Sequence, residues 1–184
     1  MISKDEMRRA ARALRRRLAA EALDAGVRLA EQVGGLPKAA MSALYLPVGS
    51  ELDTLPFARR LAGLGRGLCL PVVVEAGMPL VFRQWRPQDP LQPDLQGIAA
   101  PINIAPEVTP DLILTPLLAF DAFGGRLGQG GGYYDRTFAA HPDALRIGVA
   151  YAGQAVARVP MEPHDIRLHG VLTETGYTPA RKAD

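Results

Sequence analysis

Short apolar runs alternate with segments of helical spacing along this chain, and that alternation constrains the fold more than any other feature. Residues 43–46 and 67–74 are short apolar runs ended by proline or turn residues, as expected of strands. Between them, residues 53–64 have helical spacing that is closed by Gly65. Further bounded apolar runs, typical of buried strands, lie at residues 111–115, 146–151 and 170–173. This order predicts a three-layer α/β/α fold with a mostly parallel, mixed central sheet.

The remaining segments complete the predicted organisation. Ser3 and Glu6 form a capping-box pattern, and apolar residues then recur every three or four positions until Gly26, so residues 1–26 predict a basic amphipathic helix. Gly77 lies in a predicted hairpin turn, and the prolines of residues 87–101 predict a long loop. A chain of 184 residues suits one compact domain, so we expect residues 1–184 to form a single domain.

Charge and cysteine content exclude several classes of protein. A formal net charge of +2 is too small to imply nucleic-acid binding by itself. Cys69 is the single cysteine, which excludes a disulfide framework or a cysteine-based zinc site within one chain. The N-terminus is charged where a signal peptide needs an apolar core, and no apolar run approaches the roughly 20 residues that span a bilayer. We therefore expect a cytoplasmic protein without membrane contact.

The densest chemical signal is a glycine-rich turn within residues 120–140, which follows a predicted strand and opens a predicted helix. Glycines allow successive backbone N–H groups to converge on an anion, and the helix N-terminus adds a favourable partial charge. The spacing matches neither of the two common nucleotide-binding glycine motifs. A flexible connection is the alternative that glycine content alone leaves open. Arg126 and Asp135 favour a phosphate site, because they supply a guanidinium fork and a hard oxygen ligand for Mg²⁺.

The residue order of this segment is distinctive. It reads A-F-D at 119–121, R-L-G at 126–128 and G-G-G-Y-Y-D-R at 130–136. Other short motifs occur in order along the chain, namely Lys4 with Arg8, Y-L-P at 45–47, E-L-D-T at 51–54, L-P-V at 70–72, G-I at 97–98, G-V-A-Y at 148–151 and H-D at 164–165. With this combination the chain resembles, over nearly its whole length, the 5-formyltetrahydrofolate cyclo-ligases, also called methenyltetrahydrofolate synthetases. The resemblance implies an ATP- and Mg²⁺-dependent cyclisation of 5-formyltetrahydrofolate to 5,10-methenyltetrahydrofolate, with release of ADP and phosphate.

The resemblance also implies the residues of the site. ATP would be bound by Lys4, Arg8, Arg126, Leu127, Gly128, Gln129, Gly130, Gly131, Gly132, Tyr133 and Tyr134. The folate would contact Leu46, Glu51, Gln129 and Tyr133. Mg²⁺ would be held by Asp135 and Asp165. Catalysis would involve Arg126 and Tyr133, with Tyr133 orienting the reacting groups.

The implied mechanism needs no covalent enzyme intermediate. The oxygen of the N5-formyl group leaves too poorly for N10 to displace it, so ATP phosphorylates that oxygen, N10 attacks the activated carbon and phosphate leaves. Lys4 and Arg8 lie four positions apart and share one helix face, where two cations can clamp a polyphosphate. The expected partners are ATP and 5-formyltetrahydrofolate, with or without a polyglutamate tail, and we expect a monomer that binds no nucleic acid.

Structural roles are the alternatives at several of these positions. Arg9, Arg12, Arg15, Arg16 and Arg17 are interpreted as a solvated helix face. Asp135 and Asp165 occupy places typical of helix-start and turn aspartates, and Glu51 is otherwise a polar turn residue. A structural role is predicted for Asp121, and burial in the core is predicted for Cys69, Phe82 and Trp85. No metal is assigned to His141, His164 or His169.

Other functions stay open at this point. Members of the family often carry an acidic residue before the proline where this chain reads Ala99-Ala100-Pro101, which is compatible with a folate-binding relative that lacks turnover. A sugar-phosphate isomerase or a CoA-transferase-like enzyme is compatible with the fold class. The arginine-rich N-terminal segment is also compatible with a module that binds nucleic acid or an anionic surface.

Overall fold

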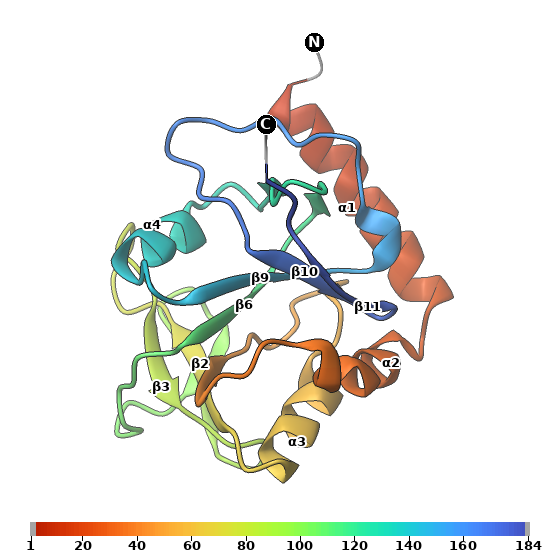
Figure 1. Cartoon of the computed structure of the whole chain (residues 1–184). Coiled ribbons are helices and arrows are strands. Elements are labelled where there is room, and N and C mark those ends of the chain that lie inside the picture. Colours follow the sequence, from red (N-terminus) through yellow and green to blue (C-terminus); the bar gives the residue numbers. More distant parts are fainter. Residues whose placement is uncertain (1–2, 183–184) are drawn as a thin grey trace.

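A mixed sheet forms the centre of the molecule, in a computed structural model that describes residues 3–182 (Figure 1). Its strands are β1 Met41–Ala43, β2 Gly67–Val72, β3 Val81–Gln84, β6 Leu112–Pro116, β9 Leu145–Val149, β10 Gly170–Thr173 and β11 Gly176–Pro179. They lie side by side in the order β11-β10-β9-β6-β1-β2-β3. The inner strands are parallel, whereas the edge strands β3 and β11 are antiparallel to their neighbours. The predicted mostly parallel, mixed sheet is confirmed. Residues 1–2 and 183–184 of the predicted domain lie outside the described residues.

Helices cover both faces of this sheet (Figure 1). α2 (Ala25–Glu31) and α3 (Leu55–Gly63) pack on one face, and α4 (Tyr133–Ala140) packs on the other. Strand β6 shows both contacts, because Leu112 and Leu114 join the core of α2 and α3 while Ile113 joins that of α4. Successive strand side chains point to opposite faces, so a strand covered on both sides is apolar throughout. The predicted three layers are therefore present.

The N-terminal helix is shorter than predicted. α1 spans Lys4–Glu21 and begins with the predicted capping box of Ser3 and Glu6. The predicted continuation to Gly26 is wrong, since the chain turns and α2 begins at Ala25. Gly26 does not stop a helix; it lies within α2, where a Cβ would come within 2.9 Å of the Asp53 carbonyl oxygen. The break lets the two helices pack in different places. Ala11 of α1 joins the cluster of the β7–β8 hairpin, whereas Ala25 of α2 is fully buried in the core on one face of the sheet.

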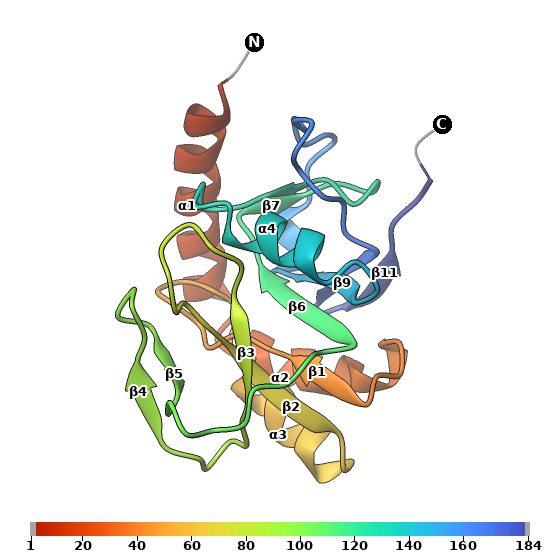
Figure 2. The same ribbon diagram turned by 90° about the vertical axis from the view of Figure 1, so that its left-hand side faces the viewer.

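Two small antiparallel hairpins are absent from the predicted pattern. β4 (Leu91–Pro93) pairs with β5 (Ala99–Pro101) inside the predicted long loop, and Figure 2 shows this hairpin standing beside β3. The carboxylate of Asp94 holds its turn by accepting the amides of Gln96 and Ile98. β7 (Ala119–Phe120) pairs with β8 (Arg126–Leu127) to form the other hairpin. Two short 3-10 turns, η1 (Gln32–Gly35) and η2 (Ala152–Gln154), complete the chain.

The strand order reverses between β1 and β6. From β1 the chain proceeds to β2 and β3 on one side, and it returns to β6 on the other side of β1 before continuing to β9, β10 and β11. Ligands of open α/β sheets bind outside the carboxyl ends of the strands at such a switch point. The topology therefore indicates a site beyond the ends of β1 and β6. Among residues 3–182, no helix has both the length and the apolar character of a membrane span.

Candidate active site

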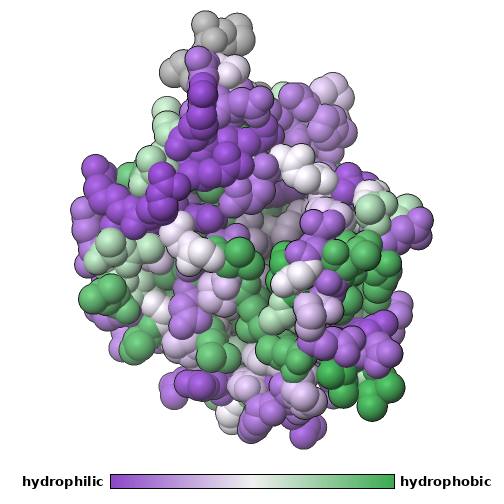
Figure 3. Space-filling view, turned by 180° about the vertical axis from the view of Figure 1, so that it is seen from behind, coloured by the Kyte–Doolittle hydropathy of each residue, from purple (hydrophilic) through white to green (hydrophobic). Residues whose placement is uncertain are grey.

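A cavity of about 710 Å³ lies at the carboxyl ends of β1, β2 and β6. Its floor includes Tyr45, Pro71 and Thr115 from those strand ends, and its walls come from α1 and the glycine-rich turn. In Figure 3, α1 forms a hydrophilic ridge beside which the surface is hollowed. Every residue predicted from the sequence for ATP, folate or Mg²⁺ lines this one cavity, namely Lys4, Arg8, Leu46, Glu51, Arg126, Leu127, Gly128, Gln129, Gly130, Gly131, Gly132, Tyr133, Tyr134, Asp135 and Asp165.

The glycine-rich turn connects β8 to α4 in a conformation that requires glycine. Gly130 has φ of 104° and Gly132, the N-cap of α4, has φ of 66°, so both occupy the left-handed region that side chains disfavour. Within the described residues, no amide of residues 128–132 donates a hydrogen bond. The turn therefore offers a series of unengaged N–H groups next to a helix N-terminus, as an anion site requires.

Arginine side chains hold the carbonyl groups of the same turn. Arg8 Nε donates to the Gly128 carbonyl oxygen at 3.2 Å, and Arg12 Nη2 donates to that of Gln129 at 3.3 Å. Arg136 Nη2 donates to the carbonyl of Gly131 at 2.8 Å. Because these cations engage the carbonyl side of the turn, its N–H groups are left for another acceptor. Arg12 stays partly exposed, as the solvated-face interpretation predicts, but its side chain also contacts the turn.

Arg126 and Asp135 form a pair at the rear of the cavity. Arg126 Nη2 lies 2.7 Å from Asp135 Oδ1, and the arginine side chain is almost fully buried beneath the ring of Phe138. The same carboxylate oxygen accepts the amide of Ile166 at 3.1 Å. Asp135 is thereby tied to the segment that carries Asp165, so the structure brings the two predicted metal ligands into one region.

Asp165 lies opposite the first turn of α1. Its Oδ2 accepts from Lys4 Nζ at 2.8 Å and from the Glu162 amide at 2.7 Å. Burial opposes ionisation of Asp165, but the hydrogen bonds from Lys4 and Glu162 and the charge of Lys4 outweigh it, so its pKa is lowered. Within the described residues, Asp135 Oδ2 and Asp165 Oδ1 accept no hydrogen bond. Carboxylate oxygens suit Mg²⁺, but the group whose possible ligand atoms lie within 4.8 Å of one another is Glu162, His164 and Asp165, and Asp135 does not belong to it.

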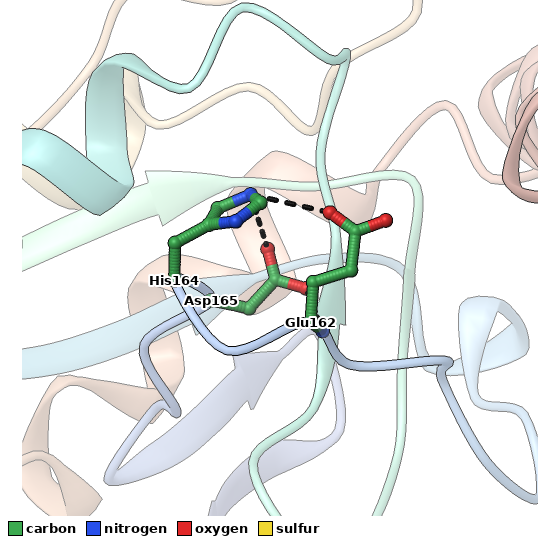
Figure 4. Close-up of side chains that lie close together, drawn as sticks. All are labelled: Glu162, His164 and Asp165. Carbon is green, nitrogen blue, oxygen red and sulfur yellow. Dashed lines mark hydrogen bonds and ion pairs between the residues drawn. The ribbon is translucent and has the colours of Figure 1, made fainter.

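Two neighbours of Asp165 lie beside its carboxylate, namely Glu162, which the sequence does not predict, and His164, the first residue of the H-D motif. Figure 4 shows the His164 ring directed toward the carboxylates of Glu162 and Asp165. His164 Nε2 lies 3.2 Å from Glu162 Oε2 and 3.8 Å from Asp165 Oδ1. Glu162 also pairs with Lys4 at 3.3 Å. Glu162 and His164 line the cavity, and Glu162 adds a carboxylate to those of Asp135 and Asp165 at this end.

Glu51 lies at the other end of the cavity, beside Leu46 and the aromatic side chain of Tyr45. Its Oε2 accepts the Val48 amide at 3.0 Å, and its Oε1 lies 3.6 Å from Arg15 Nη1. Burial raises the pKa of Glu51, while the Val48 amide and the charge of Arg15 act in the opposite direction. The interpretation of Arg15 as a solvated residue is wrong. Arg15 follows buried Ala11 by one helical turn, which is the signal that could have located it.

Several structural predictions are confirmed away from these groups. Asp121 is buried, and its carboxylate accepts the amides of Gly125 and Val159. The predicted core residues are buried, namely Cys69, Phe82 and Trp85. A second hollow, of about 860 Å³, is lined by Trp85 and by three arginines, Arg59, Arg66 and Arg86. It lies at the start of β2 and contains none of the predicted site residues.

The chain is similar to known proteins in both sequence and fold. The sequence model of the 5-formyltetrahydrofolate cyclo-ligase family matches residues 1–174. The 5-formyltetrahydrofolate cyclo-ligase of Escherichia coli K12 is 38% identical over 139 residues, which are 71% of this chain and 76% of that protein. The enzyme of the same name from Mycolicibacterium smegmatis is 36% identical over 137 residues, covering 70% and 71% of the two chains. The solution structure of 5,10-methenyltetrahydrofolate synthetase from Aquifex aeolicus superposes with a TM-score of 0.83 at 29% identity, covering 98% of this chain and 94% of that one.

Proposed function

Because the chain belongs to the 5-formyltetrahydrofolate cyclo-ligase family, and is thus a ligase, we propose that it cyclises 5-formyltetrahydrofolate to 5,10-methenyltetrahydrofolate at the expense of ATP. One observation carries this proposal above the others. A single cavity contains a turn with unengaged amides, cationic side chains from α1, paired carboxylates and an apolar pocket that ends in Glu51. The turn and the cations match the phosphates of ATP, and the carboxylates match Mg²⁺. The apolar pocket matches the ring of the folate.

The terminal phosphates of ATP would lie against the amides of residues 128–132. Lys4 and Arg8 reach the same space from one face of α1, which supports their role as counter-charges to the phosphates. Asp135 and Asp165 would hold Mg²⁺, which supplies positive charge to the phosphate oxygens. Lys4 now occupies one oxygen of Asp165, so nucleotide binding would draw Lys4 toward phosphate and release part of that carboxylate.

The folate would occupy the apolar end of the cavity. Leu46 and Tyr45 offer apolar contact to a ring, and Glu51 offers a carboxylate to its N–H groups. Tyr133 lies between the two ends, where its hydroxyl accepts from Gln96 Nε2 at 3.3 Å. This position supports a role for Tyr133 in orienting the formyl group toward the terminal phosphate.

The reaction then proceeds by phosphoryl transfer. The formyl oxygen attacks the γ-phosphorus, the bond between that phosphorus and the bridging oxygen breaks, and ADP leaves. N10 next attacks the formyl carbon and loses its proton, while the carbon–oxygen bond breaks and phosphate departs with the former formyl oxygen. Such a reaction needs alignment and charge stabilisation from the protein and no covalent catalyst.

An oxygen-isotope experiment tests this pathway. With 5-formyltetrahydrofolate labelled with oxygen-18 in the formyl group, we expect the released phosphate to carry one labelled oxygen for each methenyl product formed. Label that appears in water instead, or methenyl product formed without ADP release, would contradict the phosphorylated intermediate. The unlabelled substrate in oxygen-18 water provides the control, because its phosphate should stay unlabelled.

A further inference from the structure

Arg15 is the most deeply buried cation of α1. Its side chain is 7% exposed, and Glu51 beside it is 10% exposed. Nε donates to Ser50 Oγ at 3.2 Å, and Nη1 donates to the Leu117 carbonyl oxygen at 3.3 Å while facing Glu51 Oε1 at 3.6 Å. One guanidinium thus connects α1 to the loop after β1 and to the end of β6. Burial of such a group is costly unless each donor has a partner, so these contacts fix its position.

Arg15 is the cation that acts on the charge of Glu51 among the residues that the structure describes. Arg15 faces the carboxylate from α1, Tyr45 faces it from the segment after β1, and Tyr134 faces it from α4. Burial raises the pKa of both phenols, so both tyrosines are neutral at physiological pH. The Val48 amide adds a hydrogen bond from the loop itself. Arg15 is therefore the group whose removal would change the charge balance of this carboxylate.

We propose that Arg15 is a positioning residue that keeps Glu51 ionised and oriented for recognition of the folate ring. This inference rests on the proposed function. A pterin ring presents an amino group and an adjacent ring N–H on one edge, and both are donors. An ionised carboxylate accepts two parallel hydrogen bonds from such an edge, whereas a protonated one presents a donor of its own. Because burial raises the pKa of Glu51, the carboxylate depends on a nearby cation to stay in its accepting form.

Two substitutions separate the charge of Arg15 from its hydrogen bonds. Arg15→Gln retains a neutral N–H donor but removes the positive charge, whereas Arg15→Lys retains the charge and loses the guanidinium fork. Arg17→Gln is the matched control, because Arg17 lies on the same helix, is 68% exposed and does not line the cavity. The KM values for 5-formyltetrahydrofolate and for ATP are measured between about pH 6 and about pH 8.5, together with the melting temperature of each variant.

We expect the KM for 5-formyltetrahydrofolate of Arg15→Gln, relative to the parent value, to be largest at the acidic end of the range and to fall toward the parent value at alkaline pH, because loss of the cation favours protonated Glu51. The KM for ATP should not follow this trend. Arg15→Lys and Arg17→Gln should retain the pH dependence of the parent protein. Glu51→Gln should raise the KM for the folate at every pH, because an amide does not titrate in this range.

Three outcomes would overturn the inference. Equal pH profiles for Arg15→Gln and Arg15→Lys would show that packing, not charge, is what Arg15 supplies. A KM increase that is independent of pH in Arg15→Gln would do the same. If Arg15→Gln does not fold, a pH-dependent rise in the folate KM of Arg15→Lys alone contradicts the proposal. Failure of the parent protein to consume ATP with 5-formyltetrahydrofolate would instead overturn the proposed function, and this inference with it.

Discussion

Individual arginines in this molecule donate hydrogen bonds to the backbone of the glycine-rich turn, in addition to supplying positive charge. Arg8, Arg12 and Arg136 hold three carbonyl groups of the glycine-rich turn, those of Gly128, Gln129 and Gly131, and its amides bond no acceptor within the described residues. A residue such as Arg8 would therefore contribute twice, by shaping the turn and by meeting a phosphate.

Substitution of Arg8 tests that role. Arg8→Ala removes a charged donor to the Gly128 carbonyl and a counter-charge of the proposed phosphate site, so the KM for ATP should rise by about tenfold to a hundredfold. The KM for 5-formyltetrahydrofolate should change much less. Arg9→Ala is the control, since Arg9 is exposed and does not line the cavity. Steady-state kinetics measure the KM for each substrate. A larger increase in the KM for 5-formyltetrahydrofolate than in that for ATP would assign Arg8 to the folate instead.

Substitution of Asp135 tests the proposed metal site. Asp135→Asn keeps an oxygen acceptor for Arg126 and the Ile166 amide but removes the negative charge, so the fold should persist. The Mg²⁺ concentration that gives half-maximal activity should rise at least about tenfold. Asp143→Asn, at an exposed position after α4, should leave the Mg²⁺ dependence unchanged. An unaltered dependence in Asp135→Asn would remove this residue from the metal site.

At the scale of elements, α1 and the glycine-rich turn form one unit across the cavity. The basic helix that suggested a nucleic-acid surface directs Lys4, Arg8 and Arg15 into the cavity. The position of the glycine-rich turn depends on the β7–β8 hairpin that precedes it, and the bend of this hairpin contains Gly124. Leu168 donates its amide to the Gly124 carbonyl, so the bend also rests on the segment that follows Asp165.

Gly124 is expected to be the most sensitive point of this hairpin. Its φ is 78°, and a Cβ would clash with the Leu168 carbonyl oxygen, so Gly124→Ala should lower the free energy of unfolding by about 2–5 kcal/mol. Gly63→Ala is the control, because no atom lies within 4 Å of its added Cβ and the residue is helical. Urea denaturation measures both. Equal stabilities for the two variants would mean that the bend tolerates a side chain.

At the scale of the whole molecule, the strand order places the chemistry. Alternating apolar and helical segments predict the layers and the sheet, because a strand covered on both faces must be apolar throughout. The same patterns do not locate the turn at residues 22–24, since Ala25 continues the apolar spacing of α1 and only tertiary packing assigns it to α2. The β4–β5 hairpin is not predicted from the sequence because its prolines indicate a loop. Pro93 and Pro101 lie at strand ends, where the sheet needs no backbone N–H donor.

The candidate site was predictable where its residues are adjacent in sequence and much less so elsewhere. The glycine-rich turn with its flanking Arg126 and Asp135 forms a local motif whose chemistry can be deduced from residue type alone. Arg15 and Glu162 are different, because each becomes a site residue only when α1 is folded over the strand ends. The spacing from Ala11 to Arg15 indicates only that Arg15 lies on the buried face of the helix, so the contacts of both residues with the site are found in the structure alone.

The most direct test of the account is a crystal structure with a non-hydrolysable ATP analogue, Mg²⁺ and 5-formyltetrahydrofolate. We predict that the terminal phosphates accept hydrogen bonds from the amides of residues 128–132, with Lys4 and Arg8 on one side and the folate ring on Glu51. A nucleotide bound instead in the arginine-lined hollow near Trp85, with the glycine-rich turn empty, would contradict the central claim.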